Sequence, residues 1–155
     1  SITPFNPKNI GPCSVDLSVS NSFWLFKKKP KSLVLSNEKN FSPKLFKKIS
    51  ASAVKPLRLK PGQMALGVTS EKIRLAENVL GLLQGRSRFA RLGLMVHISS
   101  NLVQPGAENK QILEIINFSP KTISIYPGTK ICQLLFCELK GKGRYGGQFN
   151  FQEGV

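Results

Sequence analysis

The stretch that decides the fold is LKPGQMALGVTSEKIRLAENVLGLLQGRSRFARLGLMVH, residues 59–97. It opens on a Lys-Pro-Gly turn, and short apolar or β-branched runs then follow at 63–69, 78–83 and 94–98. Such runs between turn signals are typical of β-strands. The segment RSRFARL at 86–92 lacks the alternation of a strand and predicts a single helical turn. We therefore expect strands arranged around one short helix.

The same rhythm continues on both sides of this stretch. Further strand-like runs lie at 15–26, 112–118, 122–126 and 131–139, separated by Gly-Pro, Ser-Pro and Pro-Gly turns. Several short strands with frequent turns predict an all-β fold, either a sandwich, a barrel or a jelly roll. The 155 residues suit one domain, which we place at 1–140.

Two segments lack this pattern of short strands and turns. Residues 27–55 are rich in Lys, Ser and Pro and begin with KKKPK, and we interpret them as a basic surface excursion. Residues 141–155 contain five glycines together with Arg144, Tyr145 and Gln148. A Gly-rich basic tail can close over a ligand that carries phosphate, although such a tail is also often frayed.

The chain is strongly basic. It has 23 Lys and Arg residues against 8 Asp and Glu, a net charge of +15, and residues 1–60 hold 12 of the bases but only 2 of the acids. A positive field favours polyanions, either a nucleoside triphosphate or a nucleic acid. The charge alone does not choose between these partners, and an ordinary basic protein without either of them is the third interpretation.

Several kinds of site and location are disfavoured. Three cysteines cannot all pair with one another and form no Cys-x-x-Cys motif, so we expect neither a disulfide framework nor a zinc site. The Walker A, dinucleotide-binding and zinc-deaminase signatures are absent. No apolar run is long enough for a membrane span, and no signal peptide is recognisable. We expect a cytoplasmic protein, or an organellar one if the N-terminus, which lacks Met, is processed.

Two elements are candidates for chemistry. In GRSRFARLGL at 85–94, Arg86 and Arg91 flank Ser87, and arginine offers a planar fork of donors suited to phosphate; the alternative is a basic surface turn. Glu114 interrupts an apolar strand and shares its face with two isoleucines. A carboxylate there is costly to bury unless it is paired or functional. Glu114 is therefore the candidate general base, with a salt bridge to an arginine as the alternative.

The ordered series of motifs resembles a known family. It comprises GPCSVDL at 11–17, the stretch at 59–97, QILEIIN at 111–117, YPGTKICQLLF at 126–136 and RYGGQ at 144–148. This series is similar to the dCTP deaminase family, within the trimeric dUTPase-like superfamily, over nearly the whole chain. The resemblance implies a β-clip, or distorted jelly-roll, fold and a homotrimer with active sites between subunits. It also implies deamination of dCTP to dUTP, with Mg²⁺ bound through the triphosphate and no metal on the base.

The resemblance assigns roles to individual residues. Glu114 matches the catalytic glutamate, Ser87 a serine that positions the attacking water, and Arg91 an arginine that steadies the site. His97, which as a lone histidine in an apolar strand would otherwise be structural, matches a histidine that the family uses in switching between active and inactive states. Asp16, in the SVDL motif, is expected to support the fold. The positions expected to bind nucleotide are Arg86, Arg88, Ser100, Gln104, Arg144, Tyr145 and Gln148.

One segment departs from the family pattern. Residues 103–109 read VQPGAEN where the family usually reads I-D-P-G-(F/W)-x-G. Gln104 stands where dUTPases have an aspartate that activates water, and an amide cannot accept that proton, which disfavours a dUTPase and a chain that catalyses both steps. Ala107 replaces an aromatic residue, and Asn109 replaces a glycine. Two interpretations therefore stay open: a dCTP deaminase, or a catalytically degenerate scaffold that binds nucleic acid or a ribonucleoprotein.

Overall fold

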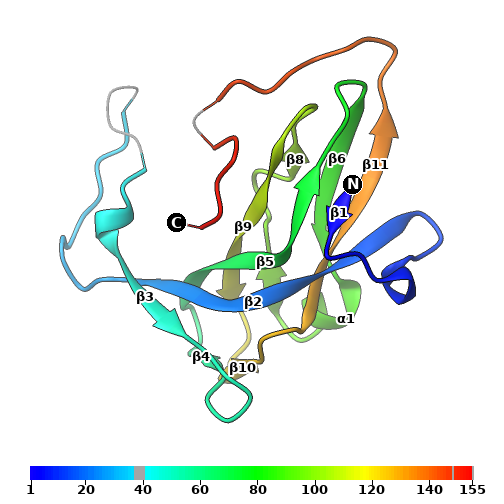
Figure 1. Cartoon of the computed structure of the whole chain (residues 1–155). Helices are drawn as coiled ribbons and strands as arrows, with labels where there is room; N and C mark the ends of the chain where they lie inside the picture. Colours follow the sequence, from blue (N-terminus) through cyan, green and yellow to red (C-terminus); the bar gives the residue numbers. More distant parts are fainter. Residues whose placement is uncertain (37–40, 148, 155) are drawn as a thin grey trace.

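The molecule is built almost entirely of antiparallel strands (Figure 1). The computed structural model describes residues 1–36, 41–147 and 149–154. In chain order the elements are β1 (Ile2–Thr3), the 3-10 turn η1 (Pro7–Asn9), β2 (Ser14–Phe26), the 3-10 turn η2 (Pro43–Leu45), β3 (Phe46–Ser50), β4 (Leu57–Leu59), β5 (Met64–Arg74), β6 (Val79–Gly85), α1 (Ser87–Ala90), β7 (Leu94–Val96), β8 (Leu102–Val103), β9 (Glu108–Asn117), β10 (Ile123–Ile125) and β11 (Lys130–Glu138). The predicted all-β fold with one short helix is confirmed.

Strand β2 joins the two halves of a curled sheet. The strand order is β7-β9-β5-β2-β11-β6-β8, with β1 added to β5 and β3 added to β2. Residues 14–18 of β2 pair with β11, whereas residues 19–25 pair with β5. The register shifts along both pairings, and such irregularities bend a strand and increase its twist. Figure 1 shows β2 crossing the molecule below β5 and β9, with β4 and β10 lower still.

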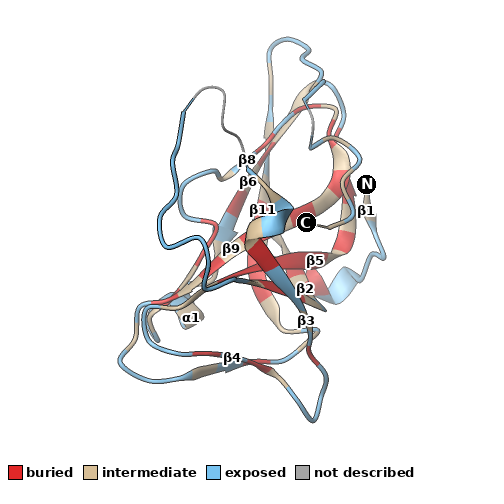
Figure 2. Ribbon diagram, turned by 90° about the vertical axis from the view of Figure 1, so that its left-hand side faces the viewer, coloured by how far each residue is buried: buried red, intermediate tan, exposed pale blue. Residues whose placement is uncertain are grey.

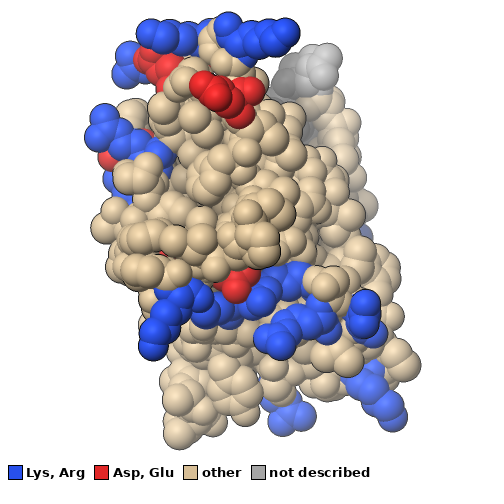
Figure 3. All heavy atoms as spheres, turned by 90° about the vertical axis from the view of Figure 1, so that its right-hand side faces the viewer, with Lys and Arg blue, Asp and Glu red and all other residues tan. Residues whose placement is uncertain are grey.

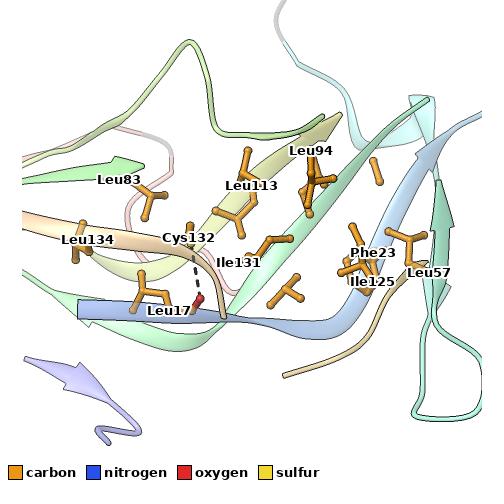
Figure 4. Packing of buried hydrophobic residues seen from close by; sticks show 14 of the residues in the cluster. Leu17, Phe23, Leu57, Leu83, Leu94, Leu113, Ile125, Ile131, Cys132 and Leu134 are labelled. Atoms are coloured by element: carbon orange, nitrogen blue, oxygen red, sulfur yellow. Dashed lines mark hydrogen bonds between the residues drawn. The ribbon is translucent and has the colours of Figure 1, made fainter. Parts of the chain in front are cut away.

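The larger of the two apolar clusters among the described residues lies inside this curl (Figure 4). It receives side chains from both halves of the large sheet, such as Phe23 of β2 and Leu113 of β9, which are fully buried. The small sheet of β4 and β10 contributes Leu57 and Ile125 and so closes one side of the core. Each large side chain buried in this way stabilises the fold by about 1.5–3 kcal/mol relative to an exposed one.

The predicted strands all form, but two of them are longer than their apolar runs. β5 continues beyond residue 69 to Arg74, and β9 starts at Glu108 rather than at residue 112. These two extensions pair with each other, as in Lys72 opposite Lys110. The sequence did not predict these extensions, because their side chains are polar and hydropathy does not report the backbone pairing that defines them.

The basic excursion is only partly a loop. Residues 27–36 are exposed throughout, as expected, but residues 46–50 form β3, which pairs with β2. Phe46 is buried against Phe26, with ring centroids 4.4 Å apart. This aromatic contact anchors the returning chain next to β2, where Figure 2 shows strand β3. Among the described residues, no helix is long and apolar enough to cross a membrane.

Candidate active site

A cavity of about 790 Å³ opens beside β5 and β9. Its apolar walls come from the ends of β2, β3 and β5 and from the loop before β9. Its polar lining consists of His97, Ser100, Gln104, Asn109, Gln111, Glu114, Tyr145 and Gln152. A mostly apolar cavity with a few convergent polar groups is the usual form of a small-molecule site.

The alternation of β9 turns Glu114 into this cavity. Leu113 and Ile115 enter the main core, so Glu114 faces the opposite side together with Ile112. Its neighbour across the sheet is Leu66 of β5, which is buried. The Glu114 side chain is 32% exposed. A half-buried carboxylate among apolar neighbours needs a partner to offset its desolvation.

His97 is that partner, whereas the sequence suggested an arginine. The Nδ1 atom of His97 lies 2.8 Å from Oε2 of Glu114, within ion-pair distance. Neither atom makes a hydrogen bond of standard geometry to any described residue, so the two groups are each other's nearest polar contact. The backbone N–H of His97 also donates to the carbonyl of Glu114, at 2.8 Å.

The expectation that His97 lies within a strand is wrong. Strand β7 ends at Val96, and His97 has a φ of +53°, a left-handed conformation that terminates the strand. This conformation directs a buried side chain, 8% exposed, to the wall of the cavity.

Three more of the predicted residues lie at the cavity. Ser100 and Gln104 are exposed and line its wall on the segment between β7 and β9. Tyr145 lines it from the C-terminal tail, and its backbone N–H donates to the carbonyl of Pro105 at 2.8 Å. Arg144 is exposed next to this contact. The predicted Gln148 lies outside the described residues.

The tail follows the free edge of β9. Asn109 donates from Nδ2 to the carbonyl of Phe149 at 2.8 Å, and the backbone N–H of Lys110 donates to the carbonyl of Gln152 at 3.1 Å. Asn109 and its hydrogen-bond partner Gln111 are buried amides in the cavity wall. The sequence treated Asn109 only as a departure from the family pattern. The sequence signal that could have identified Asn109 is the run of polar residues that leads directly into the alternating pattern of β9.

The Ser87 region does not reach this cavity within one chain. Ser87, Arg88 and Arg91 are exposed on or beside α1, and none of them lines the cavity. Arg86 pairs with Asp16 at 3.1 Å and donates to the carbonyl of Lys130 at 3.2 Å. Lys and Arg side chains gather in a band across the lower part of this side of the molecule (Figure 3). The chain therefore carries two separate groups of predicted site residues.

Sequence comparisons agree on one family. The family model described as dCTP deaminase-like matches residues 1–139. A dUMP-forming dCTP deaminase of Kocuria rhizophila is 30% identical over 160 residues, which cover 99% of this chain and 82% of that protein. A dUMP-forming dCTP deaminase of Dictyoglomus turgidum is 36% identical, over 85% of this chain and 68% of its own. A dCTP deaminase of a Marinomonas species is also 36% identical, over 85% of this chain and 71% of its own.

Solved structures support the same fold. The 2′-deoxycytidine 5′-triphosphate deaminase of Agrobacterium tumefaciens matches with a TM-score of 0.65 and 18% identity, covering 86% of this chain and 42% of that one. The dUTPase of phage phi11 of S. aureus matches with a TM-score of 0.56 and 12% identity, covering 96% and 95%. These likenesses place the curled sheet in the dUTPase-like fold, as expected. Together with the sequence matches, they show that the chain belongs to the dCTP deaminase-like family.

Proposed function

We propose that the chain deaminates dCTP in the cavity beside β9, with Glu114 as the general base. The observation that carries this proposal is the placement of Glu114 in the cavity, held by His97 at 2.8 Å. Its support is the family to which the chain belongs. A base held by a second group in a partly apolar cavity is arranged for proton transfer.

The reaction is a hydrolysis at C4 of cytosine. Water adds to C4 while Glu114 takes one of its protons and passes it to N3 of cytosine. The second proton of the added water then passes through Glu114 to the amino group, which leaves as ammonia as the C4 carbonyl forms. One water is consumed and one ammonia released for each dCTP. His97 is a positioning residue in this scheme, because its contact fixes the orientation of the Glu114 carboxylate.

We propose that Ser87, Arg88 and Arg91 complete the site from a neighbouring copy in a homotrimer. They are exposed and lie outside the cavity of their own chain, so they are free to enter the cavity of another. A neighbouring copy could cover the outer side of the sheet. There Leu82 of β6 lies opposite Leu135 of β11 and Leu102 of β8. Leu102 is 50% exposed in the single chain, and interfaces between permanent subunits are apolar at their centre.

The arginines and the tail would hold the triphosphate. Arg88 and Arg91 provide forked donors for phosphate oxygens, and Arg144 and Tyr145 stand at the cavity on a tail that can cover the nucleotide. Arg86 already pairs with Asp16, so its contribution is to position α1 as well as to add charge.

Magnesium would enter this site on the substrate. The described residues hold no group of three or more His, Cys, Asp or Glu side chains that could coordinate a metal ion. Mg²⁺ needs few protein ligands when phosphate oxygens supply the rest of its octahedron. We therefore propose that the triphosphate carries Mg²⁺ into the site, where the ion neutralises phosphate charge.

We propose dUTP as the product. Gln104 lies at the cavity wall, and its amide cannot serve as the base that a second hydrolysis, to dUMP, requires. The relatives from Kocuria rhizophila and Dictyoglomus turgidum are dUMP-forming, so the two activities must be measured separately in this chain.

The test is ammonia release from dCTP with Mg²⁺, combined with chromatography of the nucleotides. Glu114→Gln should lower turnover by about 100- to 10,000-fold, the usual contribution of a general base. Glu108→Gln is the matched control, because Glu108 lies on the same strand but pairs with Lys72 at 3.2 Å outside the cavity. An active Glu114→Gln variant would refute the mechanism, and dUMP among the products would refute the role given to Gln104.

A further inference from the structure

The chain between β2 and β3 is strongly basic, and its single acid, Glu38, lies outside the described residues. We define the basic arm as residues 27–36 and 41–48. It contains Lys27, Lys28, Lys29, Lys31, Lys44, Lys47 and Lys48 and no Asp or Glu. The salt bridges found among the described residues all involve other cations. The charge of the arm is therefore not neutralised within the part of the chain that the structure describes.

Aromatic rings lie beside these lysines. Phe26 and Phe41 are 44% and 47% exposed, and both pack on the buried Phe46, with ring centroids 4.4 and 5.6 Å from it. Phe46 thus holds the two exposed rings in place. Lys48 lies over the ring of Trp24, 5.5 Å from its centre. Rings fixed next to cations can stack on nucleobases while the cations contact phosphate.

The arm also encloses a hollow of its own. A groove of about 260 Å³ is lined by Lys27, Lys29 and Lys31 together with Phe26, Pro30, Leu33 and Leu45. Figure 2, which faces this side of the molecule, shows residues 27–36 as exposed. The groove offers apolar walls for a base or sugar and three ammonium groups for the phosphates that join them.

We propose that the basic arm binds single-stranded nucleic acid, a function additional to deamination. Its lysines lie outside the cavity at Glu114, whereas Phe26 and Phe41 also line that cavity. The concave groove and the fixed rings favour this partner over a lipid surface, which would meet a flat or convex apolar face. Lysine contacts to phosphate would supply most of the affinity, and stacking on Phe41 would add to it.

The test is fluorescence anisotropy of the full chain with labelled dT and U oligomers of about 20 nucleotides, long enough to span several binding contacts. The first variant is the triple substitution Lys27→Gln, Lys29→Gln, Lys31→Gln. The matched control removes the same charge elsewhere, by Lys121→Gln, Lys140→Gln and Lys142→Gln, at three exposed positions outside the arm. Circular dichroism and thermal unfolding verify that both variants fold.

The arm variant should bind much more weakly and with less dependence on salt. Each phosphate contact contributes about 0.7 to the slope of log affinity against log salt for single strands, so three contacts contribute about 2. Between about 50 and about 200 mM salt, the wild-type protein should therefore lose about 20-fold more affinity than the arm variant. Phe41→Ala should weaken binding about tenfold if its ring stacks on a base.

Three results would overturn the proposal. Equal losses in the arm and control variants would mean that only net charge matters. Unchanged binding in Phe41→Ala, with equal displacement by heparin, would mean that the surface attracts any polyanion. Binding to vesicles with anionic lipid, but not to the oligomers, would make a membrane surface the partner. Ammonia release by the lysine variant tests the deaminase separately, because these lysines lie outside the cavity at Glu114.

Discussion

Replacing His97 tests how the candidate site holds its base. His97→Ala removes the nitrogen that lies 2.8 Å from Glu114 and leaves a half-buried carboxylate without its partner. Contacts of this kind often align only when substrate binds, and a hydrogen bond to a charged group is then worth about 1.5–3 kcal/mol. If that energy is used fully in the transition state, kcat/KM for dCTP should fall about 10- to 150-fold.

The backbone of His97 requires a control, because its φ of +53° is unfavourable for alanine. A left-handed conformation costs an ordinary residue about 1–2 kcal/mol, whereas asparagine adopts it more readily. His97→Asn also places an amide N–H near the position of Nδ1. We expect His97→Asn to recover most of the activity and of the unfolding free energy.

The assay is steady-state ammonia release at fixed pH, together with urea unfolding of each variant. A double-mutant cycle with Glu114→Gln measures the pair in unfolding free energy, and we expect a coupling of about 1–2 kcal/mol. The reasoning fails if His97→Ala keeps kcat/KM within about twofold of the wild type. It also fails if His97→Asn is no more active than His97→Ala.

Three further predictions address assembly, packing and reactivity. Glu114→Gln and Arg91→Ala should each be inactive, and mixed oligomers of the two should regain about a quarter of wild-type activity if each site combines residues of two copies. No recovery after mixing under conditions that let subunits exchange would contradict a shared site. Gly93→Ala should lower the unfolding free energy by about 1–3 kcal/mol more than Gly62→Ala. Both glycines have positive φ, but only at Gly93 does an added Cβ meet backbone, at 2.8 Å. Equal unfolding free energies of the two variants in urea titration would refute this. Burial raises the pKa of the Cys132 thiol, which keeps it protonated and unreactive, so intact-mass analysis should show alkylation of Cys132 only after unfolding, and labelling of the native protein at this residue would contradict its burial.

Local sequence patterns were reliable wherever a single strand decides the outcome. The alternation of β9 predicted that Glu114 and Ile112 share a face, and the structure confirms it. The break in alternation after Gly85 predicted the helical turn that forms α1. These features depend on neighbours within a few residues, and such neighbours are visible in sequence.

Contacts between distant segments were not visible in the same way. Nothing in the residues around Glu114 indicated that its partner would be His97 rather than an arginine. Nor did the basic composition of residues 27–55 reveal that Phe46 anchors a strand on β2. Hydropathy gives the same weight to a residue whether its partner is 3 or 50 positions away, so it cannot identify that partner.

By itself, the sequence determined the all-β class, the short helix and the family, and it predicted Glu114 as the base. These follow from local periodicity and from motifs that keep their order. The tertiary structure alone decided that His97 holds Glu114, that the tail lies along β9, and that Ser87 and Arg91 stand apart from the cavity of their own chain. The physical reason is the curl of the sheet. It brings together backbone edges far apart in sequence, and it leaves α1 exposed on the outside.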